Sequence, residues 1–380
     1  MELDKTRRFL RHLFRSYYLE NRVLLPRDFH MREFAYQPWD SDTYKRHLSF
    51  KTVNEVQRLL STIAPRHFYY SSAKYEYPDE PDMDKKGWLG ADLVFDIDAD
   101  HLPVCQGKTI ELTTPNEEKI ELVDEECVRH AAFETLKLYD ALVYELGIPK
   151  HNIKIEFSGN RGFHVTVYLD VDDAWAKASS IERREIVNYL KAVDLLDETL
   201  NPPINVKRKK HVVCIVPTIA MSGLRGRLGR IAVLIAEKKY GNRDLARVLA
   251  KSEVVSWNLL KKLFGDIIES VFNDAREELA IYIDEQVTID IKRLIRVPYS
   301  LHGKTGLKVE PVDPQKLDDF QLSPELSPFQ RHDKITIVAL VNTPPISILG
   351  LRIKLRKGES YRLPAPQAVY LMARGLAAVK

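Results

Sequence analysis

The feature that most constrains the fold is an alternating segment near the middle of the chain, NIKIEFSGNRGFHVTVYLD (residues 152–170). Apolar and polar side chains alternate up to Phe157 and again from His164 onward, a period of two that is typical of β-strands with one buried face. A short turn containing Gly159 and Gly162 separates the two runs. The segment therefore predicts an antiparallel hairpin whose polar side chains gather on one face of a sheet.

The rest of the chain alternates between strand and helix patterns. Further strands are expected in LGADLVFDIDAD, KTIELTTPNEEKIELV, IYID, RLIRV, KITIVALV and ILGLRIKL. Helices are expected in the first ~20 residues, over Val53–Ile63, over Cys127–Gly147, through much of residues 173–280, and in AVYLMARGLAAV near the end. The predicted fold class is α/β: a mixed-sheet core made of residues 1–172 and 281–380, interrupted by a helical subdomain, residues 173–280.

Charge and composition narrow the function classes. The chain of 380 residues carries 57 Lys and Arg against 54 Asp and Glu, a net charge of +3, which argues against coating of nucleic acid but allows a local basic groove. Three cysteines cannot build a disulfide framework and suit a reducing compartment. The N-terminal segment is too charged for a signal peptide, and no apolar run approaches the ~18 residues of a membrane span. We therefore expect a soluble cytoplasmic protein without a membrane partner.

Asp96 and Asp98 are the first candidate site residues, in the segment VFDIDAD. Residues two apart on a strand share a face, so both carboxylates would converge while Phe95 and Ile97 enter the core. Carboxylates this close repel unless a cation lies between them or one is protonated, and Mg²⁺ uses one or two protein carboxylates. The competing interpretation is a solvated strand end. The apolar run before the acids favours the metal.

The tip of the predicted hairpin, SGNRGFH, carries a second candidate set. Its glycines allow a tight turn, and pairing of the strands would place Ser158 beside His164 on the polar face, with Arg161 at the tip. A hydroxyl, a guanidinium and an imidazole at one turn suit phosphate oxygens. The alternative is an ordinary turn with an exposed arginine and a Ser–His bond.

A third candidate segment is IYIDEQVTIDIKRLIRVPYSLHGKTG (residues 281–306). Asp284 follows alternating isoleucines, so its carboxylate would face away from the core, and Asp290 is its rival as a third acid. Arg296 interrupts an apolar strand and needs an anionic partner, for which a polyphosphate or an acid would serve. His302 opens a polar loop flanked by glycine.

FDIDAD, SGNRGFH and RLIRVPYSLHGKTG, in this order and with a helical stretch between the second and third, resemble the catalytic small subunit of archaeal and eukaryotic DNA primase. The resemblance includes MREFAY (residues 31–36) and YYSSAKYEYP (residues 69–78), and so spans most of the chain. It implies a core related to RNA-recognition modules, with metal-binding carboxylates on a mixed sheet and a helical subdomain beside it. It also implies template-directed synthesis of RNA or DNA primers.

Carried over by motif, the resemblance gives metal binding to Asp96, Asp98 and Asp284, and not to Asp290. It gives the nucleotide triphosphate contacts to Ser158, Arg161, His164, Arg296 and His302. The implied mechanism is two-metal nucleotidyl transfer with Mg²⁺ or Mn²⁺. The implied partners are a primase large subunit, a single-stranded DNA template, and NTPs or dNTPs.

The chain departs from this family in one segment, between the Asp-x-Asp strand and the following helix. Family members usually carry four Cys or His zinc ligands between the Asp-x-Asp strand and the following helix, whereas this interval holds Cys105 and Cys127, with His101 and His130 as further candidates. A closed zinc site needs four well-placed ligands, so a structural Zn²⁺ is the less favoured interpretation. A reduced or disulfide-bonded Cys105–Cys127 pair is the other.

Two questions stay open at this point. The basic connector, KRKKH (residues 207–211) with Arg225, Arg227 and Arg230, fits either a nucleic-acid backbone or a solvated loop. A repair or end-joining primase-polymerase shares all three motifs, although the chain length and helical insertion favour a replicative subunit. A catalytically silent nucleic-acid-binding subunit would not need the three acids, and a metal-dependent nuclease would not need triphosphate contacts.

Overall fold

The structure is a computed structural model that describes residues 2–114, 117–193, 203–208, 211–251 and 254–380. The chain divides into two compact units. Unit 1 consists of Met1–Thr135, Asn152–Ser180 and Asp284–Lys380, and unit 2 of Leu136–His151 and Ile181–Ile283. None of the described helices is both long and apolar enough to cross a membrane.

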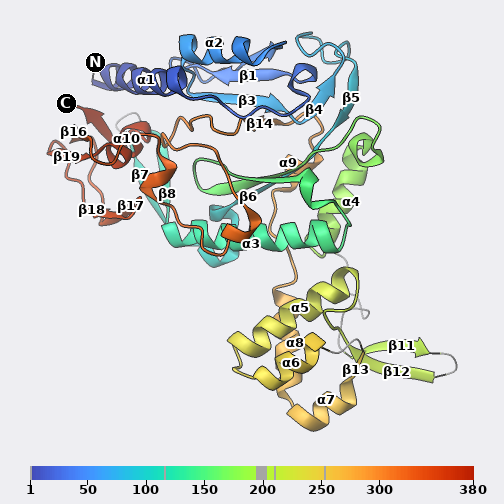
Figure 1. Ribbon diagram of the computed structural model, residues 1–380. Helices are drawn as coiled ribbons and strands as arrows, with labels where there is room; N and C mark the ends of the chain where they lie inside the picture. Colours follow the sequence, from blue (N-terminus) through green and yellow to red (C-terminus); the bar gives the residue numbers. More distant parts are fainter. Residues whose placement is uncertain (1, 115–116, 194–202, 209–210, 252–253) are drawn as a thin grey trace. The chain divides into compact units, whose positions relative to one another are not determined.

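Unit 1 contains two four-stranded sheets and several smaller ones (Figure 1). The first sheet has the order β14 (Leu294–Arg296), β3 (His67–Ser71), β1 (Phe34–Gln37) and β2 (Lys45–Leu48). The second has the order β15 (Glu310–Pro311), β9 (Ile153–Phe157), β10 (Gly162–Val167) and β6 (Leu93–Asp98). The smaller sheets are β4 (Ala73–Tyr75) with β5 (Trp88–Ala91), β7 (Thr109–Thr113) with β8 (Lys119–Val123), β17 (Ile346–Ile348) with β18 (Leu351–Ile353), and β19 (Ser360–Pro364), β16 (Lys334–Ala339) and β20 (Ala377–Val379). The helices are α1 (Glu2–Glu20), α2 (Val53–Ile63), the first part of α3 (Glu125–Tyr144), α9 (Glu285–Ile289) and α10 (Ala365–Ala373).

Helices α1 and α2 cover the outer face of the first sheet (Figure 1). Helix α2 starts in a capping box, in which the Thr52 hydroxyl accepts from the Glu55 N–H and the Glu55 carboxylate accepts from the Thr52 N–H. Its apolar side chains Val56 and Leu60 are buried against Phe34 of the sheet. This predicted helix is observed with the expected bounds.

The second sheet carries the candidate site. Its central strand β10 pairs antiparallel with β6 and β9, which confirms the predicted hairpin. One face is apolar: Phe157 and Phe163 pack with Phe320 at ring-centroid distances of 4.9–5.8 Å. On the other face, the register places His164 between Asp96 and Glu156.

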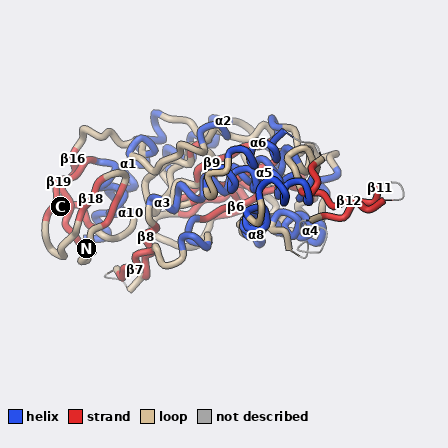
Figure 2. Tube along the Cα trace, turned by 90° about the horizontal axis from the view of Figure 1, so that it is seen from below, coloured by secondary structure: helices blue, strands red, loops and turns tan. Residues whose placement is uncertain are grey.

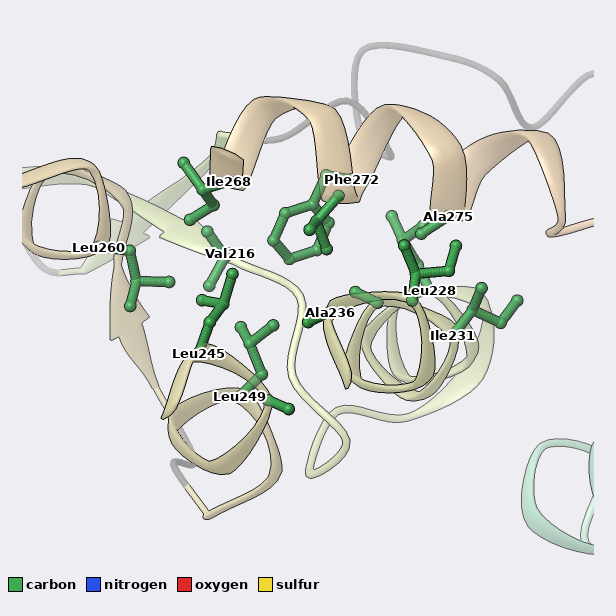
Figure 3. Close-up of a cluster of buried hydrophobic side chains, with 14 of the residues drawn as sticks. Val216, Leu228, Ile231, Ala236, Leu245, Leu249, Leu260, Ile268, Phe272 and Ala275 are labelled. Atoms are coloured by element: carbon green, nitrogen blue, oxygen red, sulfur yellow. The ribbon is translucent and has the colours of Figure 1, made fainter. Parts of the chain in front are cut away.

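Unit 2 is mainly helical. Its elements are the end of α3, α4 (Ser180–Leu190), α5 (Gly223–Lys238), α6 (Arg243–Lys251), α7 (Trp257–Phe264), α8 (Ile267–Glu277) and the strands β11 (Ile204–Arg208), β12 (His211–Val216) and β13 (Val255–Ser256). Figure 3 shows its own apolar core, in which Leu228 of α5, Leu245 of α6, Leu260 of α7 and Phe272 of α8 converge and are fully buried. This independent core explains why the segment forms a separate unit.

Two predictions about local structure were wrong. Residues 281–284, expected as a strand, form no strand, because Asp284 caps the next helix: its carboxylate accepts from the Gln286 N–H at 2.9 Å. The connector, for which a solvated loop was one interpretation, instead forms the hairpin β11–β12, seen in Figure 2, followed by helix α5. Lys209 and Lys210 lie outside the described residues.

Candidate active site

Asp96 and Asp98 lie on one face of β6, as expected, because Phe95 and Ile97 are fully buried on the other. A short 3₁₀ helix (Ala99–His101) follows, and it adds Asp100 and His101 to the same end of the strand. Among the described residues, ligand atoms of Asp98, Asp100 and His101 all lie within 4.8 Å of one another. This group includes Asp98 of the predicted pair but not Asp96, and it extends past the end of the strand.

The acids at the end of β6 are not fully neutralised by the protein. Burial, the charge of Asp96 and the charge of Asp100 outweigh Arg161 and raise the pKa of Asp98 to about 6. Burial also opposes ionisation of Asp96, but His164 and Arg296 outweigh it and hold the pKa of Asp96 below its ordinary value. A carboxylate whose pKa is raised by burial and by neighbouring acids is suited to a divalent cation, which would remove the repulsion.

Asp284 lies next to this group through the backbone, because its N–H donates to the Asp96 carbonyl at 2.9 Å. Its carboxylate caps α9 and, within the described part of the chain, does not form a group with Asp96 and Asp98 as tight as the one around Asp98. Asp290 is exposed at the other end of α9, and its carboxylate accepts from the Lys292 N–H.

The hairpin tip closes around Gly162. The Ser158 N–H donates to the Gly162 carbonyl at 2.8 Å, and the Ser158 hydroxyl accepts from the Gly162 N–H at 3.3 Å. A Cβ atom at position 162 would lie 2.4 Å from Oδ1 of Asp98, so only glycine lets the hairpin approach the acids this closely. Ser158 and His164 are not a direct cross-strand pair, because the register places His164 opposite Glu156 and Ser158 opposite Gly162, but both lie on the polar face as expected.

Arg161 and His164 each contact one of the acids. Arg161 Nη2 lies 2.7 Å from Oδ2 of Asp100, and Nη1 lies 3.4 Å from Oε2 of Glu121. His164 Nδ1 lies 3.0 Å from Oδ1 of Asp96, and its Nε2 is buried without a hydrogen bond to any described residue. The hairpin therefore places the guanidinium of Arg161 and the imidazole of His164 against the acid group.

Arg296 stands on β14, the edge strand of the first sheet, with its guanidinium 5.4 Å from the ring centroid of Tyr69. Its Nε is buried and makes no hydrogen bond to the residues that the structure describes. A cavity of about 370 Å³ is lined by Arg296, Asp96 and His164, together with Tyr44 and Arg46. This cavity joins the acid strand of one sheet to the edge of the other.

His302 is buried, with 2% of its surface exposed, and packs edge-on against His67 at 4.7 Å. Burial, Arg296 and other nearby positive groups hold its pKa well below the usual range, so the ring is neutral. Its Nδ1 accepts from the Lys304 N–H at 3.3 Å, which leaves the proton on Nε2. The Thr305 hydroxyl donates to the Gly159 carbonyl at 2.5 Å and joins this loop to the hairpin tip.

Sequence reasoning missed several residues of this region. Asp100 follows the recognised acids directly and Lys304 lies within the third segment, so their neighbours in sequence were the available signal. The sequence offered His101 only as a zinc ligand and not as a partner of the acids. Arg66 and Arg374 had no such signal, yet they line a second cavity of about 460 Å³ with Arg161, Lys304 and other residues.

Cys105 and Cys127 are joined in a disulfide. Bonded in this way, they offer no thiolate to a metal, so the structure contains the disulfide alternative and not the zinc site. The bond connects the segment after β6 with α3, on either side of the β7–β8 hairpin.

The basic connector is only partly available for nucleic acid. Arg227 is buried and makes two hydrogen bonds to the Glu145 carboxylate, at 3.0 and 2.8 Å, and Arg230 makes another at 2.8 Å. Arg227 is therefore neutralised within unit 2, and Arg230 shares the same carboxylate. Arg225 is half-buried, and Lys207 is exposed on β11.

Comparisons with known proteins identify the family of this chain. The sequence model of the family described as DNA primase small subunit matches residues 95–314. The chain is 49% identical over 377 residues to the DNA primase small subunit PriS of Hyperthermus butylicus, covering 98% of this chain and 97% of the relative. It is 35% identical over 373 residues to PriS of Archaeoglobus fulgidus, covering 97% and 98%. The polymerase domain from Mycobacterium tuberculosis Ligase D in complex with DNA aligns with a TM-score of 0.40 and 12% identity, over 82% of this chain and 85% of that one.

The family match and the length of the alignments define a DNA-directed nucleotidyltransferase. The chain belongs to the DNA primase small subunit family, of the archaeal type, and is a primase catalytic subunit of DNA replication. The resemblance based on three motifs is thereby confirmed.

Proposed function

We propose that this chain makes RNA or DNA primers on single-stranded DNA by two-metal nucleotidyl transfer, with Mg²⁺ or Mn²⁺ held by Asp96, Asp98 and Asp284. The observation that carries this proposal is the acid group at the end of β6, where burial and neighbouring carboxylates raise the pKa of Asp98 to about 6. Oxygen ligands of this kind suit hard divalent cations. When bound, such cations lower the pKa of the primer 3′-hydroxyl and neutralise charge on the triphosphate.

The protein's own part is to bind and orient the nucleotide. The residues proposed for the triphosphate are Ser158, Arg161, His164, Arg296 and His302. Two observations support them: Nε atoms of Arg161 and Arg296 are buried without a hydrogen bond to described residues, and neutral His302 keeps its proton on Nε2, from where it can donate to an oxygen. Holding the phosphates in line lowers the entropy cost of the reaction.

We further propose residues 1–172 and 281–380 as the catalytic core, related to RNA-recognition modules, with residues 173–280 as an inserted subdomain. The relatives are named as small subunits, which supports a large subunit as the partner of this chain in a heterodimer. The proposed substrates are NTPs or dNTPs and a single-stranded DNA template.

The direct experiment is primer synthesis from NTPs or dNTPs on single-stranded DNA with Mg²⁺ or Mn²⁺, with and without added primer. We expect new primers that depend on the cation and disappear in the Asp98→Asn variant. Extension of a supplied primer alone would indicate a polymerase that does not initiate. DNA binding without synthesis would indicate a silent subunit, and degradation of the template a nuclease.

A further inference from the structure

The C-terminal end of α10 contacts the hairpin tip from the opposite end of the chain. Arg374, which follows this helix, donates from Nη2 to Oδ1 of Asn160 at 2.5 Å and to the Tyr370 hydroxyl at 3.1 Å. Its Nη1 donates to the Glu121 carbonyl on β8 at 3.1 Å. Figure 1 shows α10 beside the β7–β8 hairpin. The guanidinium of Arg374 is thus fixed against Asn160, the residue that precedes Arg161, although Arg374 belongs to none of the three motifs.

The cavity beside Arg374 is rich in positive charge. Its volume is about 460 Å³. Its lining includes the basic residues Arg7, Arg66, Lys119, Arg161, Lys304 and Arg374, and the acidic residues Asp40, Asp42, Glu118 and Glu121. The positive side chains therefore outnumber the negative ones around the space, which favours an anionic ligand.

The protein leaves donors in this cavity unused. The Nε atoms of Arg161 and Arg374 are both buried, and neither makes a hydrogen bond to a residue in the described part of the chain. Buried donors are normally paired, so these two indicate a ligand that supplies acceptors. Phosphate oxygens are such acceptors, and guanidinium groups bind them with two parallel hydrogen bonds.

The local electrostatics point the same way. Burial and the charges of Arg66, Arg374, Arg296 and Arg161 lower the pKa of Lys304. Four guanidinium groups thus act on one ammonium. A ligand with several negative charges would raise the pKa of Lys304 back toward its ordinary value.

We propose that Arg374 is a further phosphate-binding residue, and that the cavity it shares with Arg161 and Lys304 receives the terminal phosphates of the nucleotide and then the pyrophosphate. This inference rests on the proposed function. In that reaction the primer 3′-oxygen forms a bond to the α-phosphorus while the bond from the α-phosphorus to the bridging oxygen breaks. Pyrophosphate leaves with the electron pair, and the hydroxyl proton passes to solvent.

The rival explanation is that Arg374 only supports the hairpin tip through Asn160. The two roles are separable. Tyr370→Phe removes one acceptor that anchors Arg374 and keeps its charge, Arg374→Gln removes the charge and keeps a donor for Asn160, and Arg374→Ala removes the charge and both contacts. Arg356→Ala is the matched control. Arg356 is exposed, and its guanidinium forms a surface ion pair with Glu359 at 3.7 Å, which contributes little to stability.

The experiment measures binding of inorganic tripolyphosphate and of pyrophosphate by calorimetry, on the full chain without template or divalent cation. We expect Arg374→Ala to weaken both by about 10-fold or more, as loss of a charged hydrogen bond implies, and Arg374→Lys to recover part of the loss. Tyr370→Phe and Arg356→Ala should bind as the unmodified chain does. If Arg374→Ala does not fold, Arg374→Gln, which keeps a donor toward Asn160, replaces it.

Unchanged binding in Arg374→Ala, or an equal loss in Tyr370→Phe, would overturn the inference. Its failure is distinguishable from failure of the proposed function. If Asp98→Asn abolishes primer synthesis while Arg374→Ala binds polyphosphate normally, only the inference about Arg374 fails. If Asp98→Asn still makes primers, the proposed function fails whatever Arg374 does.

Discussion

Asp92 and Asp98 lie six residues apart on one stretch of unit 1, yet their surroundings are opposite. The Asp92 carboxylate is fully buried and receives Arg32 Nη2 at 2.7 Å, Lys74 Nζ at 3.1 Å and the Leu169 N–H at 3.1 Å. Asp98 instead faces other acids, and its pKa rises to about 6. A buried acid whose charge is neutralised by protein groups contributes to the fold. An acid that faces other acids is instead available to bind a ligand.

The largest effect is expected at Asp98, the acid that the protein does not neutralise. Asp98→Asn should lower primer synthesis on the order of 1,000-fold, because metal binding supplies several kcal/mol of transition-state stabilisation. Stability should stay unchanged or rise, since the substitution removes like-charge repulsion. Synthesis assays and urea unfolding measure the two effects. Asp290→Asn is the matched control and should be mild, and a fully active Asp98→Asn would refute the assignment.

The converse effect is expected at Asp92. Asp92→Asn leaves the half-buried Asp28 as the remaining acidic partner that the structure shows for the buried Arg32 and Lys74, so the free energy of unfolding should fall by about 3 kcal/mol. Activity per folded molecule should change little, because Asp92 does not line either cavity among the described residues. Urea unfolding combined with activity normalised to the folded fraction tests this. Unaltered stability would mean that the ion pairs around Asp92 contribute nothing.

Glu156 provides an intermediate case, because it is buried beside His164 without a full set of partners. Burial raises its pKa from an ordinary 4.5 to about 7, although His164 and Lys154 oppose the shift. The contribution of neutral Glu156 to stability is therefore complete below about pH 4.5, and up to about 3 kcal/mol of it is lost as pH rises through 7, since the unfolded chain ionises first. Glu156→Gln should be more stable than wild type at pH 8 and equal to it below pH 4.5. Urea midpoints at both pH values check this, and equal midpoints at pH 8 would contradict it.

A smaller effect is expected at the hairpin tip, where Arg161 and His164 would hold phosphates. Substitution of either by alanine should raise the nucleotide KM by about 10- to 100-fold, the range for a lost charged hydrogen bond. Template affinity should hardly change. Steady-state kinetics and DNA-binding titrations separate the two. Loss of template affinity with a constant nucleotide KM would place the tip in the DNA site.

Local patterns in the sequence predicted much of this architecture. The period of two gave the β9–β10 hairpin and the shared face of Asp96 and Asp98, because strand geometry depends on near neighbours. The same pattern failed at residues 281–284, where alternating isoleucines precede a helix cap and no strand pairs with them. The register was also misjudged, because Ser158 bonds to Gly162 and not to His164.

Residues brought together only by tertiary structure were beyond sequence reasoning. Arg374 is 214 positions from Asn160, and nothing in its helix indicates a contact with the hairpin. Arg227 appeared as a free cation in a basic run, whereas Glu145, 82 positions away, neutralises it. Whether a charge is satisfied depends on such distant partners, and this decides between a structural and a functional role.

The most direct test of the account is Mn²⁺ binding to the full chain without nucleotide, followed by electron paramagnetic resonance of the free ion. Asp98→Asn should weaken Mn²⁺ binding by at least about 10-fold, while Asp290→Asn binds as wild type does. Wild-type affinity in Asp98→Asn would contradict the claim that the unneutralised acids of β6 form the metal site.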